Sequence, residues 1–152
     1  MKDPAGNNLN NQYETGTGFT IEARPSFVAV GYDGTILTSG DGTTWSSKTS
    51  SNTGIYSNEN LVDLAYGNNL FVVVGTHQSH IYSSSNGTSW TLRSTCYSSC
   101  KSLTYGNGIF VVGSASYLKT SSDGITWNSY HFSSVANSYL YGLTFGSNTF
   151  VG

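Results

Sequence analysis

The sequence has few charged residues and very little cysteine, proline or methionine. Charged side chains make up 9% of the 152 residues, the formal net charge is −2, and there are 2 Cys, 2 Pro and 1 Met. An average soluble domain carries about 25% charged residues. A surface with so little charge offers no electrostatic attraction to nucleic acid or to anionic lipid. We therefore expect no nucleic-acid partner. No apolar run approaches the roughly 18 residues of a membrane helix, so membrane insertion is not expected either.

The N-terminal residues 1–18, MKDPAGNNLNNQYETGTG, lack the apolar core of a secretory signal peptide. They are polar and rich in Asn and Gly, so we expect a flexible arm ahead of a folded region over residues 19–152. A cytosolic protein, export by another route, and a leader upstream of Met1 all stay open.

The two cysteines, Cys96 and Cys100, lie in a polar segment that is typical of a loop. A disulfide that closes this loop is the leading interpretation, because the composition is typical of extracellular proteins. Two free thiols are the alternative. A metal pair is less favoured, because no second pair of ligands follows at the spacing of a zinc site.

Aromatic residues and an internal repeat are what the sequence has in abundance. Aromatic side chains make up 14% of the chain, too many for a disordered polar tract. Three patterns recur in a fixed order about every 40 residues. S-x-[DN]-G-x-[ST]-W occupies residues 39–45, 84–90 and 121–127; L-x-[YF]-G-[NS] occupies residues 64–68, 103–107 and 143–147; Phe-Val runs begin at Phe27, Phe71, Phe110 and Phe150.

Each repeat divides into four short strands joined by tight turns at Gly-Asn and [DN]-G pairs. The Phe-Val runs are apolar at successive positions, so we expect these strands to be buried on both faces. Four antiparallel strands every 40 residues are typical of a β-propeller blade. The sequence therefore predicts an all-β fold of about three and a half blades. The expected ranges are about 19–50, 60–95 and 101–131, with a partial blade at 139–152.

The S-x-[DN]-G-x-[ST]-W segments resemble the Asp-box repeat of sialidase-type β-propellers, one residue shorter than its commonest form. The resemblance covers about residues 27–152 and extends to repeats in bacterial and phage surface proteins of unassigned activity. It implies that these turns are structural and lie on the propeller edge away from the usual ligand face. The residues concerned are Ser39, Asp41, Gly42, Trp45, Ser84, Asn86, Gly87, Trp90, Ser121, Asp123, Gly124 and Trp127.

Catalysis is not expected, although the family contains glycosidases. The resemblance implies a clamp of three arginines in an active sialidase, whereas this chain has Arg24 and Arg93 alone. Acids are few, and Glu59 is the one glutamate among the repeats. No cofactor or metal is expected, because one carboxylate per turn is too few for calcium and extended-chain spacing sends His77 and His80 to opposite faces. A degenerate glycosidase stays as an alternative.

A ligand surface, if present, is expected on the loops between the second and third strands of each blade and on the loops between blades. Exposed Tyr and His rings beside side-chain amides are suited to contact with a glycan or a peptide. The alternative is that Tyr merely replaces other apolar residues. The candidate residues are Tyr32, Asp33, His77, Gln78, Tyr97, Tyr130 and His131.

About three and a half blades are fewer than the four to eight of a closed propeller. Three resolutions stay open: a second copy that completes the ring, the rest of a longer propeller, or an open-ended filament. The expected function is a non-catalytic recognition or scaffold module at an extracellular, cell or virion surface. An extracellular structural or filament-forming assembly protein is the alternative.

Overall fold

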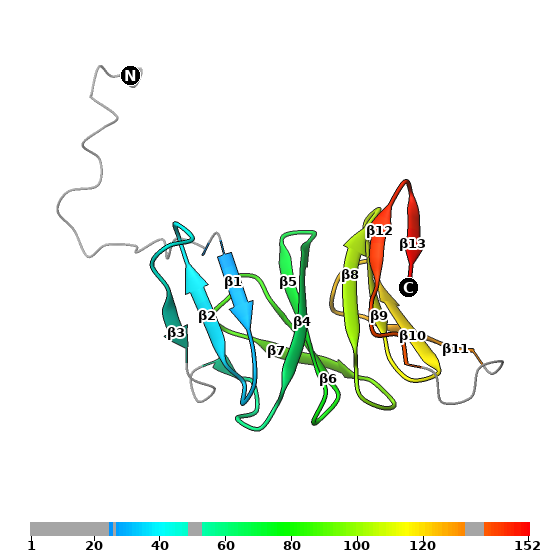
Figure 1. Cartoon of the computed structure of the whole chain (residues 1–152), viewed down its shortest axis with the longest axis horizontal. Helices are drawn as coiled ribbons and strands as arrows, with labels where there is room; N and C mark the ends of the chain where they lie inside the picture. The colour runs from blue at the N-terminus through cyan, green and yellow to red at the C-terminus, as the bar shows by residue number, and fades with distance from the viewer. Residues whose placement is uncertain (1–24, 26, 49–52, 133–138) are drawn as a thin grey trace, which may run out of the picture.

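The computed structural model describes residues 25, 27–48, 53–132 and 139–152, so the expected arm over residues 1–18 lies outside the described residues. Strands β1 to β13 form sheets in which each strand pairs antiparallel with the next along the chain (Figure 1). The predicted all-β class and propeller blades are confirmed. Within the described part of the chain, no helix has the length and apolar character needed to cross a bilayer.

The four sheets of the described residues are named blades 1 to 4 in chain order. Blade 1 holds β1 (Phe27–Val30), β2 (Ile36–Ser39) and β3 (Ser46–Lys48). Blade 2 holds β4 (Leu61–Gly67), β5 (Leu70–Gly75), β6 (His80–Ser84) and β7 (Thr91–Thr95). Blade 3 holds β8 (Ser102–Gly106), β9 (Ile109–Gly113), β10 (Tyr117–Ser121) and β11 (Asn128–His131). Blade 4 holds β12 (Thr144–Gly146) and β13 (Thr149–Val151).

The hairpins between the first two strands of blades 2 and 3 turn at pairs of residues with positive φ. Asn68 and Asn69 have φ of 47° and 60°, and Asn107 and Gly108 have 47° and 79°. Two consecutive positive φ values are what the tightest hairpin turns require, and Asn and Gly adopt them at the lowest cost. The Gly-Asn pairs therefore set the register of the strands that carry the Phe-Val runs.

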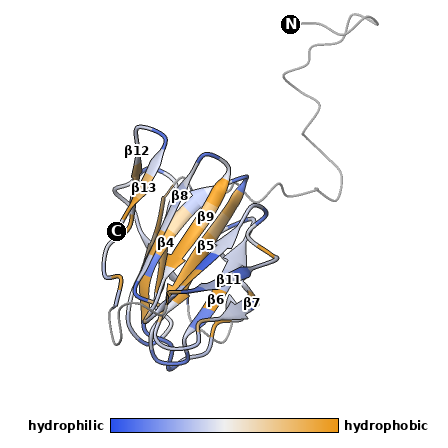
Figure 2. Ribbon diagram, turned by 90° about the vertical axis from the view of Figure 1, so that its right-hand side faces the viewer, coloured by the Kyte–Doolittle hydropathy of each residue, from blue (hydrophilic) through white to orange (hydrophobic). Residues whose placement is uncertain are grey.

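The hydrophobic core lies between blades, and β5 contributes to both of its halves. Val72 and Val74 pack with Phe110 in a cluster shared with blade 3. Phe71 and Val73 face the other way, into a cluster shared with blade 1. Figure 2 shows that β4, β5 and β9 are largely hydrophobic along their length. The expected burial of this strand on both faces is confirmed, because neighbouring side chains of a strand point to opposite faces.

The S-x-[DN]-G turns close the outer hairpins of blades 1 to 3 with one hydrogen-bond pattern. The Asp41 Oδ1 atom accepts from the Thr43 and Thr44 N–H groups at 2.8 and 2.7 Å. Asn86 Oδ1 does the same in blade 2 at 3.0 and 2.9 Å, and Asp123 Oδ1 in blade 3 at 2.8 and 2.7 Å. In all three turns the Gly N–H donates to the Ser hydroxyl at 2.8 Å. The shared requirement is an acceptor oxygen, not a charge.

The tryptophan that ends each S-x-[DN]-G-x-[ST]-W segment packs against the Phe that begins the Phe-Val run of the same blade. The ring centroids are 6.4 Å apart for Phe27 and Trp45, and 6.5 Å apart in both blade 2 and blade 3. The three indoles thus occupy equivalent places, as expected of a true structural repeat.

Candidate functional site

One end of the sheets carries the loops β1–β2, β5–β6 and the segments between blades, and the S-x-[DN]-G turns lie at the other end (Figure 1). We call this end the loop edge; it comprises residues 31–35, 53–60, 76–79 and 96–101. Its segments are joined by backbone hydrogen bonds, among them Gly34 N to Glu59 O at 2.7 Å and Cys96 N to Ser79 O at 2.7 Å. Five of the seven candidate ligand residues lie here: Tyr32, Asp33, His77, Gln78 and Tyr97.

Tyr32 and Asp33 lie at the tip of the β1–β2 loop. Asp33 has a φ of 55°, which Asp tolerates better than most residues, and its N–H lies 3.5 Å from Asn60 Oδ1. The Tyr32 side chain is 75% exposed. The loop is anchored by its backbone, so both side chains are free to meet solvent.

His77 and Gln78 are held by Glu59, a residue whose role the sequence did not reveal. Glu59 is fully buried, and its Oε1 atom accepts from the His77 and Gln78 N–H groups at 3.1 and 3.0 Å. The other oxygen, Oε2, lies 2.9 Å from His80 Nδ1, within ion-pair distance. The carboxylate therefore fixes the β5–β6 loop from beneath.

His80 is the first residue of β6 and has Tyr82 and Tyr56 beside it. The Tyr82 hydroxyl lies 3.0 Å from His80 Nδ1, and the Tyr56 ring centroid lies 5.2 Å from that of the imidazole. Burial, together with the nearby Glu59, raises the pKa of Tyr82 to about 12. In the described residues no three His, Cys, Asp or Glu side chains gather as metal ligands would.

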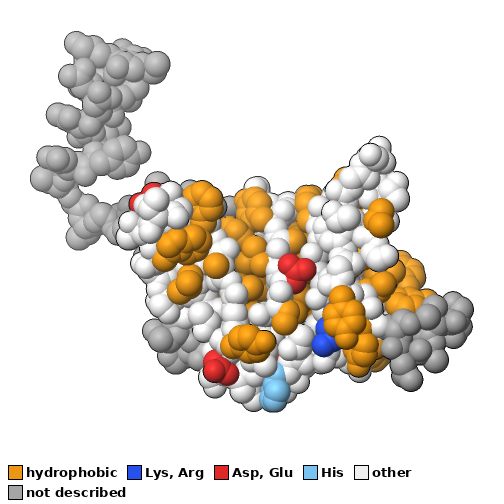
Figure 3. Space-filling view, in the orientation of Figure 1, with side chains coloured by type: hydrophobic (Ala, Val, Ile, Leu, Met, Phe, Trp, Pro, Cys, Tyr) orange, Lys and Arg blue, Asp and Glu red, His pale blue; other side chains and the backbone are white. Residues whose placement is uncertain are grey.

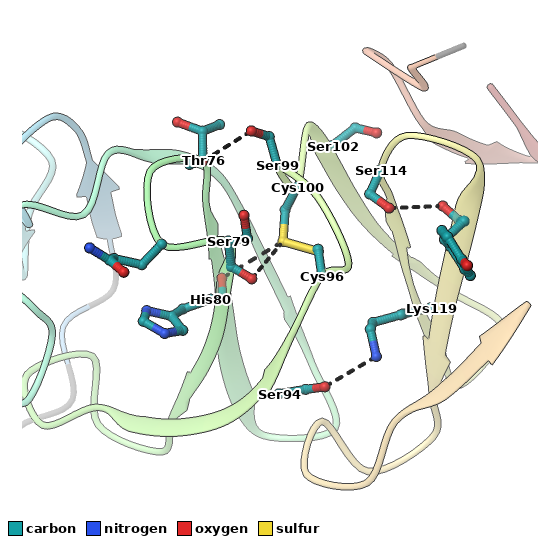
Figure 4. The surroundings of a disulfide bond; sticks show 12 residues. Thr76, Ser79, His80, Ser94, Cys96, Ser99, Cys100, Ser102, Ser114 and Lys119 are labelled. Carbon is teal, nitrogen blue, oxygen red and sulfur yellow. Dashed lines mark hydrogen bonds between the residues drawn. A yellow bond between two sulfur atoms is a disulfide. The ribbon is translucent and has the colours of Figure 1, made fainter. Parts of the chain in front are cut away.

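A disulfide joins Cys96 and Cys100 across the loop between blades 2 and 3 (Figure 4). The Cys100 side chain is buried beside the β5–β6 loop, and the Ser99 hydroxyl donates to Thr76 O at 3.1 Å. These contacts tie the disulfide loop to the loop that Glu59 holds. Tyr97, between the two cysteines, is left 69% exposed.

Tyr97 lies in a row of tilted rings that contact one another, together with two residues of blade 3. Its ring centroid lies 4.5 Å from that of Tyr117, and the Tyr117 centroid lies 4.6 Å from that of His131. We call Tyr97, Tyr117 and His131 the aromatic platform. Aromatic rings at such separations attract each other through offset packing.

Lys119 supports the aromatic platform from below. Its Nζ atom donates to Ser94 Oγ at 3.3 Å (Figure 4). It also donates to Ser129 Oγ at 2.8 Å and lies 5.3 Å from the centre of the Tyr97 ring. No carboxylate pairs with it among the described residues. Burial lowers the pKa of this ammonium group. Its cation–π contact helps to hold the Tyr97 ring in place.

Tyr130 and His131 were expected in a loop, and this expectation was wrong. Both belong to β11, where Tyr130 pairs with Leu118 and His131 with Tyr117. Side chains alternate along a strand, so Tyr130 points away from the platform that His131 joins. Tyr117 and Lys119 were missed, although their spacing of two residues on a strand places them on one face.

The loop edge carries hydrophobic and charged side chains together. In the view of Figure 3, acidic, basic and histidine side chains lie among side chains of the hydrophobic class, which there includes Tyr, along the lower margin. A surface of this kind offers a ligand both apolar and polar contacts.

Comparison with known proteins places the chain by its fold. No family model and no curated protein matches the sequence. Among solved structures, it is similar to that titled "YCF48 bound to D1 peptide", with a TM-score of 0.54 and 19% sequence identity. The match covers 67% of this chain and 34% of that chain, so the matched part spans about a third of the solved protein. Together with the antiparallel four-stranded sheets, this likeness shows that the chain is built of β-propeller blades.

Proposed function

We propose that this chain is a non-catalytic recognition module of Asp-box propeller blades that binds its ligand at the loop edge. The observation that carries the proposal is the aromatic platform, in which an exposed Tyr97 is fixed by a disulfide loop, a ring stack and a buried cation. A binding surface that is rigid before the ligand arrives loses little entropy on association.

A glycan is the ligand class that best fits the platform. Tyrosine rings present flat apolar area at low entropy cost, and their hydroxyl groups add hydrogen bonds. The apolar face of a sugar ring can lie on such a surface while its hydroxyl groups meet nearby amides such as Gln78. A peptide is the second candidate, because the solved structure of similar fold is described as bound to a peptide.

The placement of the carboxylates supports a non-catalytic module. Those of Asp41 and Asp123 accept backbone N–H groups within their turns, and Glu59 is buried beneath a loop. Asp63 accepts from the Leu64 and Leu103 N–H groups, both at 2.8 Å. A glycosidase needs two acids that face the scissile bond from opposite sides, so these four carboxylates already serve other purposes.

The three equivalent turns support the Asp-box assignment, and the disulfide supports an extracellular, cell-surface or virion location. Disulfides persist in oxidising compartments and are rare in the cytosol of mesophiles.

The test is a screen of immobilised glycans and, separately, of peptides with the wild-type chain, Tyr97→Ala and Tyr130→Ala. Tyr130→Ala is the matched control, since this exposed ring points away from the platform. We expect the immobilised glycans to retain the wild type and Tyr130→Ala but not Tyr97→Ala. Binding that is as strong in Tyr97→Ala as in the wild type contradicts the proposed site. Hydrolysis of a fluorogenic sialoside contradicts the non-catalytic assignment.

A further inference from the structure

The ring contact at the centre of the aromatic platform occurs a second time, one blade earlier. Tyr97 lies in the segment before blade 3, and its ring meets that of Tyr117, the first residue of β10, at an interplanar angle of 33°. Tyr56 lies in the segment before blade 2, and its ring meets that of His80, the first residue of β6, at 32°. We call Tyr56 and His80 the second ring pair. The repeat therefore places an inter-blade tyrosine against the start of the third strand in both blades.

The second ring pair is held in place as firmly as the aromatic platform. Ile55, next to Tyr56, is buried in the core, and the Tyr56 carbonyl accepts from the Glu59 N–H group at 3.0 Å. The Tyr82 hydroxyl and Glu59 Oε2 lie 3.0 and 2.9 Å from His80 Nδ1. The Tyr56 side chain is nevertheless 56% exposed. It is thus a second tyrosine ring that is fixed by its neighbours and open to a ligand.

Both ring pairs lie on the same side of their blades. Tyr82, two residues after His80, packs in the core cluster shared with blade 1. Lys119, two residues after Tyr117, donates to Ser94 of blade 2. Residues two apart on a strand share a face. Each ring pair therefore lies on the side of its blade that is turned toward the preceding blade.

The β5–β6 loop connects the two ring pairs. Ser79 precedes His80, and its carbonyl accepts from the N–H group of Cys96, the residue before Tyr97, at 2.7 Å. The Gln78 side chain in the same loop is exposed and offers an amide between the two sites. Sheets that pack face to face lie about 10 Å apart. A ligand that reaches both tyrosines must therefore be longer than a single sugar ring.

We propose that the loop edge binds a glycan chain of several sugar units, with one unit on Tyr97 and another on Tyr56. This inference rests on the proposed function and names the ligand class of the same site: a repeating ligand that meets a repeating protein surface. Once one unit is bound, the next contact is intramolecular, and linked contacts of this kind raise affinity by about a hundredfold or more. The Tyr97 site alone holds a short glycan, and Tyr56 contributes when the chain is long enough.

The test is isothermal titration calorimetry of the full chain with soluble cello-, chito- and manno-oligosaccharides, each from the disaccharide to the hexasaccharide. A disaccharide covers one site and a hexasaccharide covers both. In the ladder that binds, affinity should rise at least about tenfold from the disaccharide to the hexasaccharide. Tyr56→Ala should remove this gain and leave the affinity for the disaccharide unchanged, whereas Tyr97→Ala should weaken both. Tyr130→Ala is the matched control, because Tyr130 is also 56% exposed and belongs to neither site.

The outcomes separate this inference from the proposed function. Equal affinity of the wild type for short and long chains, or a length dependence that persists in a Tyr56→Ala variant with the near-UV circular dichroism of the wild type, overturns the inference and leaves the Tyr97 site standing. Tyr56→Phe keeps the ring and should behave as the wild type; a loss of the gain in this variant also overturns the inference. Glycan binding that is unaffected by Tyr97→Ala overturns the proposed site. Binding of peptides but of no oligosaccharide overturns the glycan class, and with it the inference, as does a failure to bind any of the three ladders.

Discussion

The ring of Tyr105 lies against the backbone of Gly67 in the preceding blade, so closely that a Cβ at position 67 would stand well inside 3.0 Å of the ring carbons. Phe145 covers Gly106 in the same way one blade further on. The glycine and the aromatic residue of the L-x-[YF]-G pattern are therefore two halves of one contact between neighbouring blades. Gly146 has no atom within 4 Å of such a Cβ.

Gly67→Ala should destabilise the fold, whereas Gly146→Ala should not. The added methyl group at position 67 forces the Tyr105 ring away, and overpacking of this kind costs about 1–3 kcal/mol. At position 146 the space is open, and a surface change of this size stays within about 0.5 kcal/mol. Urea denaturation of the two variants measures the difference. Equal losses of stability would show that the ring contact is not what demands glycine.

The turn of blade 2 should tolerate a charge but not the loss of its acceptor. Asn86→Ala removes the oxygen that serves the Thr88 and Ser89 N–H groups, and a lost cap of this kind costs about 1–2 kcal/mol. Asn86→Asp keeps the oxygen in place, as Asp41 and Asp123 do in the other turns. At neutral pH the wild type and Asn86→Asp should have similar midpoint temperatures of thermal unfolding, and Asn86→Ala should have a clearly lower one. An Asn86→Asp variant as weak as Asn86→Ala contradicts this account.

Acid should destabilise the protein through the other two turns. Hydrogen bonds from Thr126 and Ile125 hold the pKa of Asp123 at about 2, below its ordinary value of 3.8, and those from Thr44 and Thr43 lower the pKa of Asp41 further. A carboxyl group whose pKa is lower in the folded state than in the unfolded state stabilises the fold at pH values above the unfolded-state pKa. This stabilisation is lost as the pH falls through the folded-state pKa. Unfolding free energy should therefore drop between about pH 4 and pH 2.

The double variant Asp41→Asn with Asp123→Asn isolates this pH effect. It keeps both acceptor oxygens and removes the two titrating groups, so its stability should fall less steeply than that of the wild type over the same pH interval. Burial raises the pKa of Asp63, so its protonation at low pH favours the folded state. Asp63 is present in both proteins, so its effect cancels in the comparison. Parallel pH profiles for the two proteins would rule out the turns as the source of the acid sensitivity.

The fold could be predicted from the sequence because its information is local and repeated. Trp45, Trp90 and Trp127 each end the same seven-residue pattern, one in each of three hairpins. A pattern that recurs in this way indicates a recurring structural unit. The apolar run after Phe71 predicts a strand that is buried on both faces, as a strand packed between two layers is. Nothing in these inferences depends on knowing which distant segments meet.

The candidate site was predicted only in part because it depends on contacts between blades. Tyr117 meets Tyr97 across 20 residues of sequence, and the angle between blades decides that meeting. The role of Glu59 depends on such a contact, because its carboxylate fits beneath the β5–β6 loop in the room that Gly75 leaves. Tyr130 and His131 were misplaced because the sequence pattern does not show at which residue the last strand of a blade ends.

Removal of the disulfide should weaken both the fold and the aromatic platform. Closing a loop of about five residues constrains the unfolded chain by roughly 2 kcal/mol. The double variant Cys96→Ala with Cys100→Ala should lose about that much stability, and it should also lose more ligand affinity than Tyr130→Ala does. Unfolding and binding are both measurable on the same sample. Unchanged binding in the double variant would show that Tyr97 does not need the closed loop.

Glu59 should be sensitive to the loss of its acceptor oxygen and tolerant of the loss of its charge. Glu59→Ala leaves the His77 and Gln78 N–H groups without a partner and opens a buried void, a combination worth about 3–5 kcal/mol. Glu59→Gln retains an oxygen for both N–H groups and loses only the charge that faces His80 Nδ1. Amide hydrogen exchange at residues 77 and 78 should therefore accelerate sharply in Glu59→Ala and little in Glu59→Gln. Fast exchange in both variants would mean that the negative charge itself holds the loop.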